Sequence, residues 1–207
     1  FMKGYIVYPD YIVNDGKTYV RLFGRLENGQ SFLTINNISP YFYIKEVDLN
    51  KSKKLLTKFS IDKTNFTTFH NDKVIKISSS LSTDVNKLIS SLHDLKIDTY
   101  EADIKPHNRF LLDNDILTSI EIEGEYQPNE KIDRIYNNPD IKKTIFNPKL
   151  KIISIDLESD KSLGKLFCIG IYSENYKKVI MVTDKKLENV ISCRSEAECL
   201  EEFKKEV

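Results

Sequence analysis

The stretch KIISIDLE at residues 151–158 alternates β-forming apolar residues with polar ones and ends on two carboxylates. Alternation of this kind predicts a strand with one face buried. Two further runs of β-formers follow at 167–172 and 178–182, and residues 195–198 read SEAE, a capping box that opens an amphipathic helix. We therefore expect a three-stranded meander followed by a helix at this end of the chain.

Asp156 and Glu158 are two residues apart on the first of these predicted strands. Alternate side chains of a strand project from one face about 6.6 Å apart, so both carboxylates can aim at one point. Converging oxygen ligands suit Mg²⁺ or Mn²⁺, and two-metal nucleases use such ions to hold the attacking and leaving oxygens of a phosphodiester. The pattern predicts metal-dependent phosphodiester cleavage with Asp156 and Glu158 as catalytic metal ligands. The alternative, from this tripeptide alone, is a pair of solvated surface carboxylates.

The first 45 residues are also rich in aromatic and β-branched residues, which favour strands. The turn-forming sequences NDG at 14–16 and ENG at 27–29 separate them and favour tight hairpins. The sequence therefore predicts an antiparallel meander. Its expected strands cover residues 5–8, 11–13, 18–23, 31–35 and 41–44.

Residues 82–95 have apolar positions at helical spacing, with Ser82 and Thr83 available to cap the first turn. A shorter helix is expected at 48–58, and strands at 74–77 and 99–102. Strands followed by helix and strand indicate a compact α+β domain over residues 2–120. Residues 121–149 are acidic and then rich in Asn and Pro, which predicts a crossing linker with one strand in it.

Composition excludes several protein classes. Among 207 residues, 40% are apolar and 30% charged, as in ordinary globular proteins, and no apolar stretch approaches the roughly 18 residues of a membrane helix or forms a signal peptide. We expect a cytoplasmic protein that does not bind membranes. Cys168, Cys193 and Cys199 form an odd set without a CxxC pair, which argues for reduced thiols.

The net charge bears on nucleic-acid binding. Thirty-one basic residues balance 31 acidic ones, which argues against a protein that grips duplex DNA by itself. Residues 1–60 carry nine basic and five acidic residues, whereas residues 101–150 carry seven and ten. A phosphate-facing surface is therefore expected near the N-terminus. The lysine run at 51–58 could touch phosphate or simply form a solvated helix face.

Beyond these patterns, the chain resembles the family B DNA polymerases, especially the bacterial DNA polymerase II type and its archaeal relatives. SIDLES at 154–159 is similar to the D-I-E-T of the family's first exonuclease motif, and LFCIG at 166–170 to the bacterial L-Y-C-I-G. YIVNDGK at 11–17 and PYFY at 40–43 are similar to archaeal N-terminal sequences. YEADIKP at 100–106, followed by RFL at 109–111, is similar to the bacterial type. The resemblance covers nearly the whole chain.

The resemblance implies the N-terminal part of a DNA-directed DNA polymerase, a nucleotidyltransferase of replication or repair that also proofreads. Residues 150–207 would be the truncated start of a 3′–5′ exonuclease domain of ribonuclease H-like fold. By the resemblance, Asp156 would bridge two Mg²⁺ or Mn²⁺ ions and Glu158 would help hold the ion that activates water. The family's other metal-binding aspartates are absent here, so we expect the 207-residue chain alone to be inactive and to bind metal weakly or not at all.

The same resemblance assigns the N-terminal domain to the template side, with primer–template and single-stranded DNA as partners. Tyr11, Pro40 and Tyr41 match residues around the archaeal pocket that reads template uracil, and Arg109 also matches a family position. The stretch around Asn71 and the pair Lys105-Pro106 depart from the archaeal pattern. Tyr11, Tyr41 and Tyr43 could stack on template bases or pack a β-core.

Three points stay open at the level of sequence. The chain could instead be a stand-alone ribonuclease H-like nuclease, or a non-catalytic nucleic-acid-binding module such as the small subunit of a split polymerase. The sequence does not say whether a sliding clamp binds the parent protein. The expected chain is a monomer associated with the nucleoid.

Overall fold

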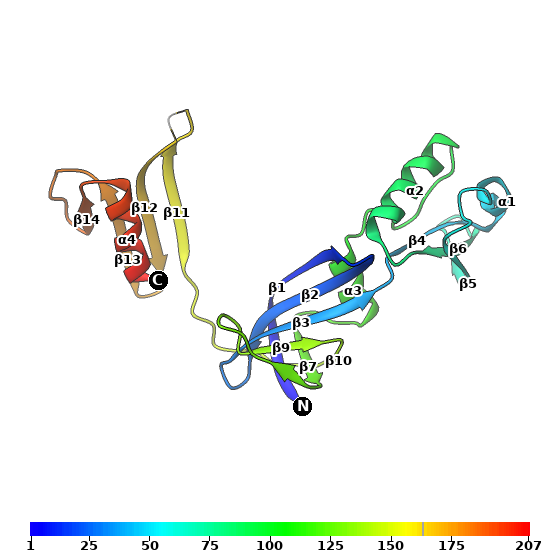
Figure 1. Cartoon of the computed structure of the whole chain (residues 1–207), viewed down its shortest axis with the longest axis horizontal. Coiled ribbons are helices and arrows are strands. Elements are labelled where there is room, and N and C mark those ends of the chain that lie inside the picture. The colour runs from blue at the N-terminus through cyan, green and yellow to red at the C-terminus, as the bar shows by residue number, and fades with distance from the viewer. Residues whose placement is uncertain (163) are drawn as a thin grey trace. The chain divides into compact units, whose positions relative to one another are not determined.

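A computed structural model describes residues 1–162 and 164–207 (Figure 1). The chain divides into two compact units, Phe1–Pro148 and Lys149–Val207, and each is described by itself. Within the described part of the chain, no helix is both long and apolar enough to cross a membrane. The expected α+β fold is confirmed.

A seven-stranded sheet forms the larger part of the first unit, in the order β10-β7-β1-β2-β3-β9-β8 (Figure 1). Its strands are β1 (Met2–Asn14), β2 (Lys17–Leu26), β3 (Ser31–Ile38), β7 (Ser119–Glu123), β8 (Tyr126–Gln127), β9 (Arg134–Asn137) and β10 (Asp140–Lys143). The expected meander is confirmed as β1, β2 and β3, and the first hairpin turns where Asp15 and Gly16 both take positive φ. The strands expected at 5–8 and 11–13 are one strand, with a register shift between Ile6 and Tyr8.

The core of this sheet is built around Phe32, which is 1% exposed. Gly4 and Gly24 leave room for its ring: a Cβ at Gly24 would lie 2.5 Å from the ring and 2.0 Å from the carbonyl oxygen of Tyr5. Helix α3 (Pro106–Asp113), which the sequence analysis did not predict, packs Phe110 and Leu111 against the same core.

A second core lies under a three-stranded sheet in the order β4-β6-β5. The elements of this region are β4 (Tyr41–Lys45), the 3-10 helix η1 (Glu46–Asp48), α1 (Leu49–Ser52), β5 (Ser60–Thr67), β6 (Lys73–Ser78) and α2 (Ser82–Asp94). Helix α2 confirms the predicted amphipathic helix and buries Val85, Leu88 and Leu92.

Two local predictions for this region are wrong. The helix expected at 48–58 ends at Ser52, and the chain continues in turns whose N–H groups donate to the residue three positions back, which bring Leu55 and Leu56 onto the core. The strand expected at 99–102 is a single bridge between Tyr43 and Tyr100, because Glu101 takes a positive φ that ends the extended backbone.

Residues 121–149 are not a linker with one strand. They contribute β8, β9, β10 and the end of β7 to the seven-stranded sheet, and β9 runs parallel to β3. These strands have two to five residues, too few to show a period, and their turns use positive φ at Gly124 and Asn138. The first compact unit consequently extends to Pro148 rather than ending near residue 120.

The second unit confirms the expected meander of β11 (Ser154–Asp160), β12 (Lys165–Ser173) and β13 (Tyr176–Val182). A fourth strand, β14 (Val190–Cys193), pairs in parallel with β13 and was not predicted. Ile169, Ile171 and Ile180 form the core with Cys193 and Cys199. All three cysteines of the chain are free thiols.

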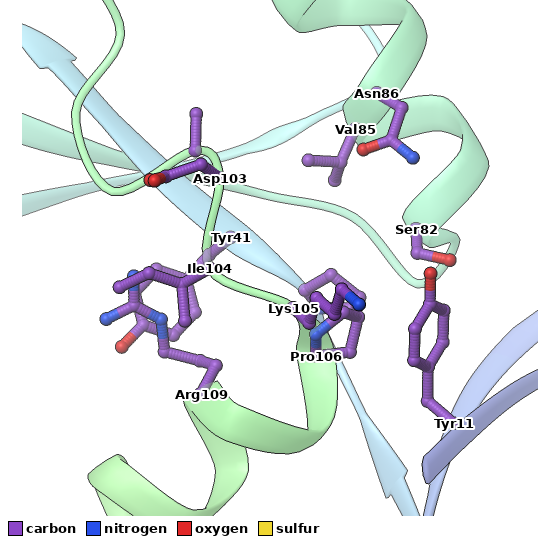
Figure 2. Close-up of a pocket in the computed structure, with 12 residues that line it drawn as sticks. Tyr11, Tyr41, Ser82, Val85, Asn86, Asp103, Ile104, Lys105, Pro106 and Arg109 are labelled. Atoms are coloured by element: carbon purple, nitrogen blue, oxygen red, sulfur yellow. The ribbon is translucent and has the colours of Figure 1, made fainter.

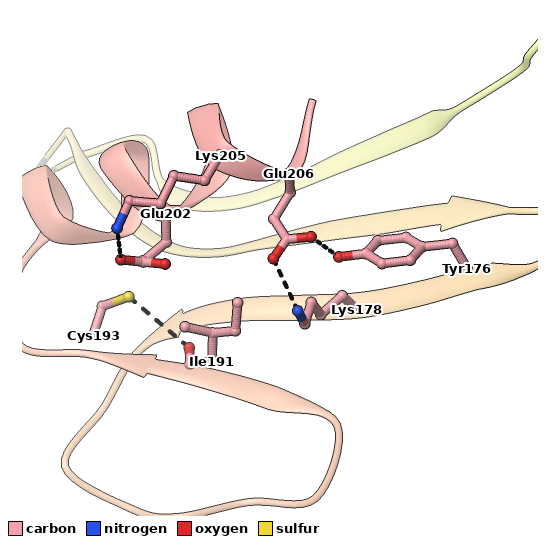
Figure 3. A network of polar contacts seen from close by, with 7 residues as sticks. All are labelled: Tyr176, Lys178, Ile191, Cys193, Glu202, Lys205 and Glu206. Atoms are coloured by element: carbon pink, nitrogen blue, oxygen red, sulfur yellow. Dashed lines mark hydrogen bonds and ion pairs between the residues drawn. The ribbon is translucent and has the colours of Figure 1, made fainter.

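Helix α4 (Glu196–Glu206) begins at the predicted capping box. Ser195 Oγ accepts from the Glu198 backbone N–H at 3.2 Å, and the Glu198 carboxylate accepts from the Arg194 N–H at 2.7 Å. At the other end, Glu206 accepts hydrogen bonds from Lys178 Nζ and the Tyr176 hydroxyl (Figure 3). Helix α4 is thus held to the rest of its unit at both ends.

Candidate nucleic-acid interface and carboxylate pair

The four residues that the sequence analysis assigned to nucleic-acid binding line one cavity of about 260 Å³ in the first unit. Tyr11 comes from β1, Tyr41 is the first residue of β4 and Pro40 directly precedes it, and Arg109 comes from α3. The cavity lies against the first turn of α2 and the segment 102–106 (Figure 2). Residues up to 98 positions apart in sequence therefore meet at one site.

Tyr41 is held by three charged side chains. Its hydroxyl donates to Asp113 Oδ1 at 2.7 Å, and its ring centroid lies 4.0 Å from Lys76 Nζ and 4.6 Å from the Arg109 guanidinium carbon. Burial first, and then the hydrogen bond to Asp113, raise the pKa of the Tyr41 phenol far above its ordinary value. The ring thus stays a neutral phenol, and a base that stacked on it would compete with these cations.

Arg109 is 8% exposed and brings an unused donor to this cavity. Its Nη1 donates to Glu101 Oε2 at 2.7 Å, and its Nη2 to the Glu101 carbonyl oxygen at 3.2 Å. Its buried Nε has no hydrogen-bond partner among the residues that the structure describes. Buried donors are normally satisfied, so this unpaired N–H is an unusual feature of a residue that lines the cavity.

Tyr11 lies beside His107, with ring centroids 5.9 Å apart and an interplanar angle of 29°. Burial first, and then the charge of Lys105, lower the pKa of His107. The Tyr11 hydroxyl points toward Ser82 at the start of α2 (Figure 2). The sequence analysis gave no role to any histidine, and only the position of His107 after the helix-starting Pro106 could have drawn attention to it.

Asp156 and Glu158 lie on the same face of β11, as their spacing predicts, and both are exposed. They pair across the sheet with Gly170 and Cys168 of β12. Gly170 leaves the space beside Asp156 open, since even an added Cβ would only reach 3.9 Å from the Asp156 Cβ. Burial and then the charges of Glu158 and Asp156 raise the pKa of the Cys168 thiol. The face is therefore acidic and accessible.

The opposite face of the same sheet carries the core. Ile155 and Leu157 pair with the buried Ile171 and Ile169, so they project toward the side that α4 covers. Among the residues that the structure describes, no three His, Cys, Asp or Glu side chains gather in a group that could hold a metal ion. Asp156 and Glu158 fit a divalent cation as two oxygen ligands of a larger set.

The comparisons with known proteins agree with the resemblance found in the sequence. No family model matches the chain. DNA polymerase II of Escherichia coli (strain K12) is 31% identical over 87 residues, which cover 42% of this chain and 10% of that protein. A DNA polymerase of Archaeoglobus fulgidus is 24% identical over 206 residues, which cover 89% of this chain and 26% of that protein.

The fold has a counterpart among solved structures. The family B DNA polymerase of the hyperthermophilic archaeon Pyrobaculum calidifontis superposes with a TM-score of 0.72 and 19% identity, over 99% of this chain and 29% of that one. This chain therefore spans a tenth to less than a third of the proteins it matches. Sequence matches and fold together confirm that the chain resembles the N-terminal region of family B DNA polymerases.

Proposed function

We propose that this chain is the N-terminal part of a DNA-directed DNA polymerase with a 3′–5′ proofreading exonuclease, acting at the nucleoid. In this proposal, residues 1–148 contact the template strand and residues 149–207 begin a ribonuclease H-like exonuclease domain. The observation that carries the proposal is the placement of Asp156 and Glu158 on one open face of β11, a strand that pairs only with β12 among the described residues.

The two carboxylates would hold divalent cations in the complete polymerase. Bound Mg²⁺ or Mn²⁺ supplies Lewis acidity for hydrolysis of the terminal phosphodiester. Asp156 and Glu158 contribute negative oxygens from a rigid strand, because α4 and the core fix β12, and β12 fixes β11. Gly170 keeps the neighbouring position free of a side chain, which leaves room for the 3′ end of a strand.

The chain alone should be inactive in this proposal. Mg²⁺ keeps its waters unless several oxygen ligands offer near-octahedral geometry, and two carboxylates do not. We therefore expect the 207 residues to hydrolyse no DNA and to extend no primer. The remaining ligands would come from other segments of the polymerase.

The first unit would supply the template contact through the cavity that contains Tyr11, Tyr41 and Arg109. The free Nε of Arg109 offers a donor to a base carbonyl or a phosphate oxygen. Lys105 adds a positive charge to the same lining. A nucleotide held there would be read through acceptor oxygens rather than through stacking on Tyr41, whose ring already contacts two cations.

The experiment uses a polymerase that contains this chain at its N-terminus. The variant D156N/E158Q should lose removal of a mispaired 3′ nucleotide while it retains primer extension. The matched control is E174Q, which neutralises an exposed carboxylate in the turn between β12 and β13 and should keep both activities. Full exonuclease activity in D156N/E158Q would contradict the assignment of this face.

A further inference from the structure

A second hollow in the first unit, here called the aromatic groove, differs from the cavity lined by Tyr11, Pro40, Tyr41 and Arg109, here called the template cavity, because it is larger and richer in aromatic side chains. It has a volume of about 950 Å³ and lies over β4, the β5–β6 loop and residues 100–101. Five aromatic side chains line it: Tyr41, Tyr43, Phe66, Phe69 and Tyr100. We propose that the aromatic groove binds unstacked bases of single-stranded DNA, with Phe69 as a stacking platform. This inference rests on the proposed function of residues 1–148 as the template-contacting part.

Three of the five rings of the groove contact one another in sequence. The centroids of Tyr41 and Tyr43 are 5.6 Å apart and those of Tyr43 and Phe66 are 6.1 Å apart, both edge to face. Phe66 is 64% exposed and Phe69 is completely exposed. Tyr43 is 9% exposed, so the ring faces open to a ligand are mainly those of Phe66 and Phe69, and every nucleobase has a face that can stack on them.

Phe69 stands on a fixed turn. The Thr68 backbone N–H donates to the Asp72 carbonyl oxygen at 2.9 Å, and the Asn71 N–H donates back to the Thr68 carbonyl oxygen at 2.9 Å. Lys45 Nζ of β4 contacts Asp72 Oδ2 at 2.9 Å and ties this turn to the sheet. An exposed ring on an ordered turn loses little conformational freedom on binding, which favours a ligand site.

The segment that supplies most of the aromatic groove carries a net positive charge. Residues 41–78 contain eight lysines and four carboxylates, an excess of four positive charges in a chain whose formal net charge is zero. The carboxylates that line the groove are engaged, Glu101 by Arg109 and Asp113 by the Tyr41 hydroxyl. The positive excess therefore belongs to the segment as a whole, and the charged side chains that a phosphate meets in the groove itself are Arg109, Glu101 and Asp113.

A hollow of about 330 Å³ adjoins the aromatic groove and shares Phe66, Thr67 and Val74 with it. Lys63, Lys73 and Glu46 line this hollow, and because Lys63 Nζ lies 4.0 Å from Glu46 Oε1, Lys73 is the lysine that offers its charge to a phosphate. Proteins that bind single-stranded DNA usually stack the bases on aromatic rings and hold the neighbouring phosphates with positively charged side chains. The groove also shares Tyr41 and Arg109 with the template cavity, so one strand can run from one site to the other.

The test measures binding of the full chain to a fluorescent oligothymidine of about 20 nucleotides by anisotropy. F69A should weaken binding roughly 5- to 100-fold, the range of a lost base–aromatic stack. F69L, which keeps the apolar volume but removes the flat ring, should bind nearly as weakly as F69A. The matched control is L117A, which removes an equally exposed apolar side chain outside both hollows and should not change the affinity.

The chain contains no tryptophan, so F69W introduces a single indole at the site, which is excited selectively at wavelengths where the 11 tyrosines do not absorb. Its emission should be quenched by the oligonucleotide over the same concentration range that raises the anisotropy, because stacked bases quench indole. Unchanged F69W emission at saturating DNA would overturn the proposal, and so would wild-type affinity in F69A or F69L.

A second variant tests the phosphate contact. K73Q should lower the slope of log affinity against log salt concentration by about 0.7, the value for one phosphate of a single strand, whereas K151Q in the second unit should leave it unchanged. If the chain binds the oligonucleotide but F69A and K73Q have no effect, the groove proposal fails and the proposed template contact stands. If the chain does not bind single-stranded DNA even at low salt, both fail.

Discussion

Strands β1 and β11 were both expected from runs of β-forming residues, but they differ in how many neighbouring strands pair with them. Strand β1 pairs on one side with β2 and on the other with β7, and it buries Gly4 and Ile6. Among the residues that the structure describes, strand β11 pairs only with β12, and its apolar residues Ile155 and Leu157 are 46% and 59% exposed although they project toward the core side. Alternation therefore predicts a strand and its faces, whereas the number of neighbouring strands decides how much is buried.

The difference also separates the roles of the two regions. In the first unit, the buried strands act as a frame for the cavity and the aromatic groove. In the second unit, the strand with the open edge itself carries the carboxylates. Substitutions in the buried strands of the first unit should therefore lower stability strongly. Substitutions of the carboxylates on β11 should affect function and leave stability nearly unchanged.

The largest expected effect is on the core of the first unit. F32A removes a ring that is 1% exposed and should destabilise that unit by about 3–5 kcal/mol. L157A on β11 removes a side chain that is 59% exposed and should change stability by less than about 1 kcal/mol. Urea unfolding monitored by hydrogen exchange, which resolves the two units, measures the loss of stability in each variant. Equal losses in the two variants would contradict the comparison.

Two glycines give a sharper version of the same contrast. G24A places a Cβ 2.0 Å from the Tyr5 carbonyl oxygen, which forces the backbone apart and should destabilise the first unit by about 1–3 kcal/mol or more. G170A places a Cβ 3.9 Å from Asp156, an ordinary contact, and should have little effect. Thermal unfolding of the two variants against the wild type measures the difference. Comparable melting temperatures for both would show that the Gly24 contact relaxes easily.

The helix caps differ as well. S195A removes the acceptor of the Glu198 N–H and should destabilise α4 by about 1 kcal/mol. T83A should leave the stability of α2 unchanged, because the N-cap residue of that helix is Leu81, which has no side-chain cap. Thr18 Oγ1 of β2 accepts the Ser82 N–H at 2.9 Å instead. Hydrogen exchange of the first turn of each helix reports the change. Faster exchange in T83A and unchanged exchange in S195A would show that Thr83, and not Ser195, caps its helix.

The smallest expected effect is a pH dependence at His107. Its pKa is lowered in the folded chain, so as the pH falls below the unfolded value of about 6.5 the unfolded state takes up a proton first. Stability should consequently be full above about pH 7 and decline as the pH falls through the lowered pKa. The urea midpoint of H107Q should lack this part of the decline, and identical pH profiles for both chains would exclude it.

Much of the architecture could be predicted from the sequence because it is local. The Asp-Gly turn at 15–16, the helix at 82–95 and the capping box at Ser195 each follow from a few neighbouring residues. The strands between 126 and 143 could not be predicted, since two to four residues show no period, and the one that joins them to the meander, β9, pairs with β3 about 100 positions away. The cap that Thr18 provides for α2 was missed for the same reason.

The candidate sites divide in the same way. The spacing of Asp156 and Glu158 fixed their common face, and the family resemblance selected the four residues that line the template cavity. His107, Lys76 and Phe69 were missed, because a ring stack, a cation over a ring and complete exposure depend on where distant segments meet. Exposure of Phe69 in particular contradicts the usual expectation for a phenylalanine.

The most direct test of the two-region account is binding of the full chain to single-stranded DNA across a salt series, in parallel with D156A. We predict that affinity falls as salt rises, because lysines of the first unit must displace the cations bound to the DNA phosphates and added salt opposes this displacement. We also predict that D156A binds as the wild type does. Loss of binding in D156A, or no binding at low salt, would contradict the assignment of the DNA contact to residues 1–148.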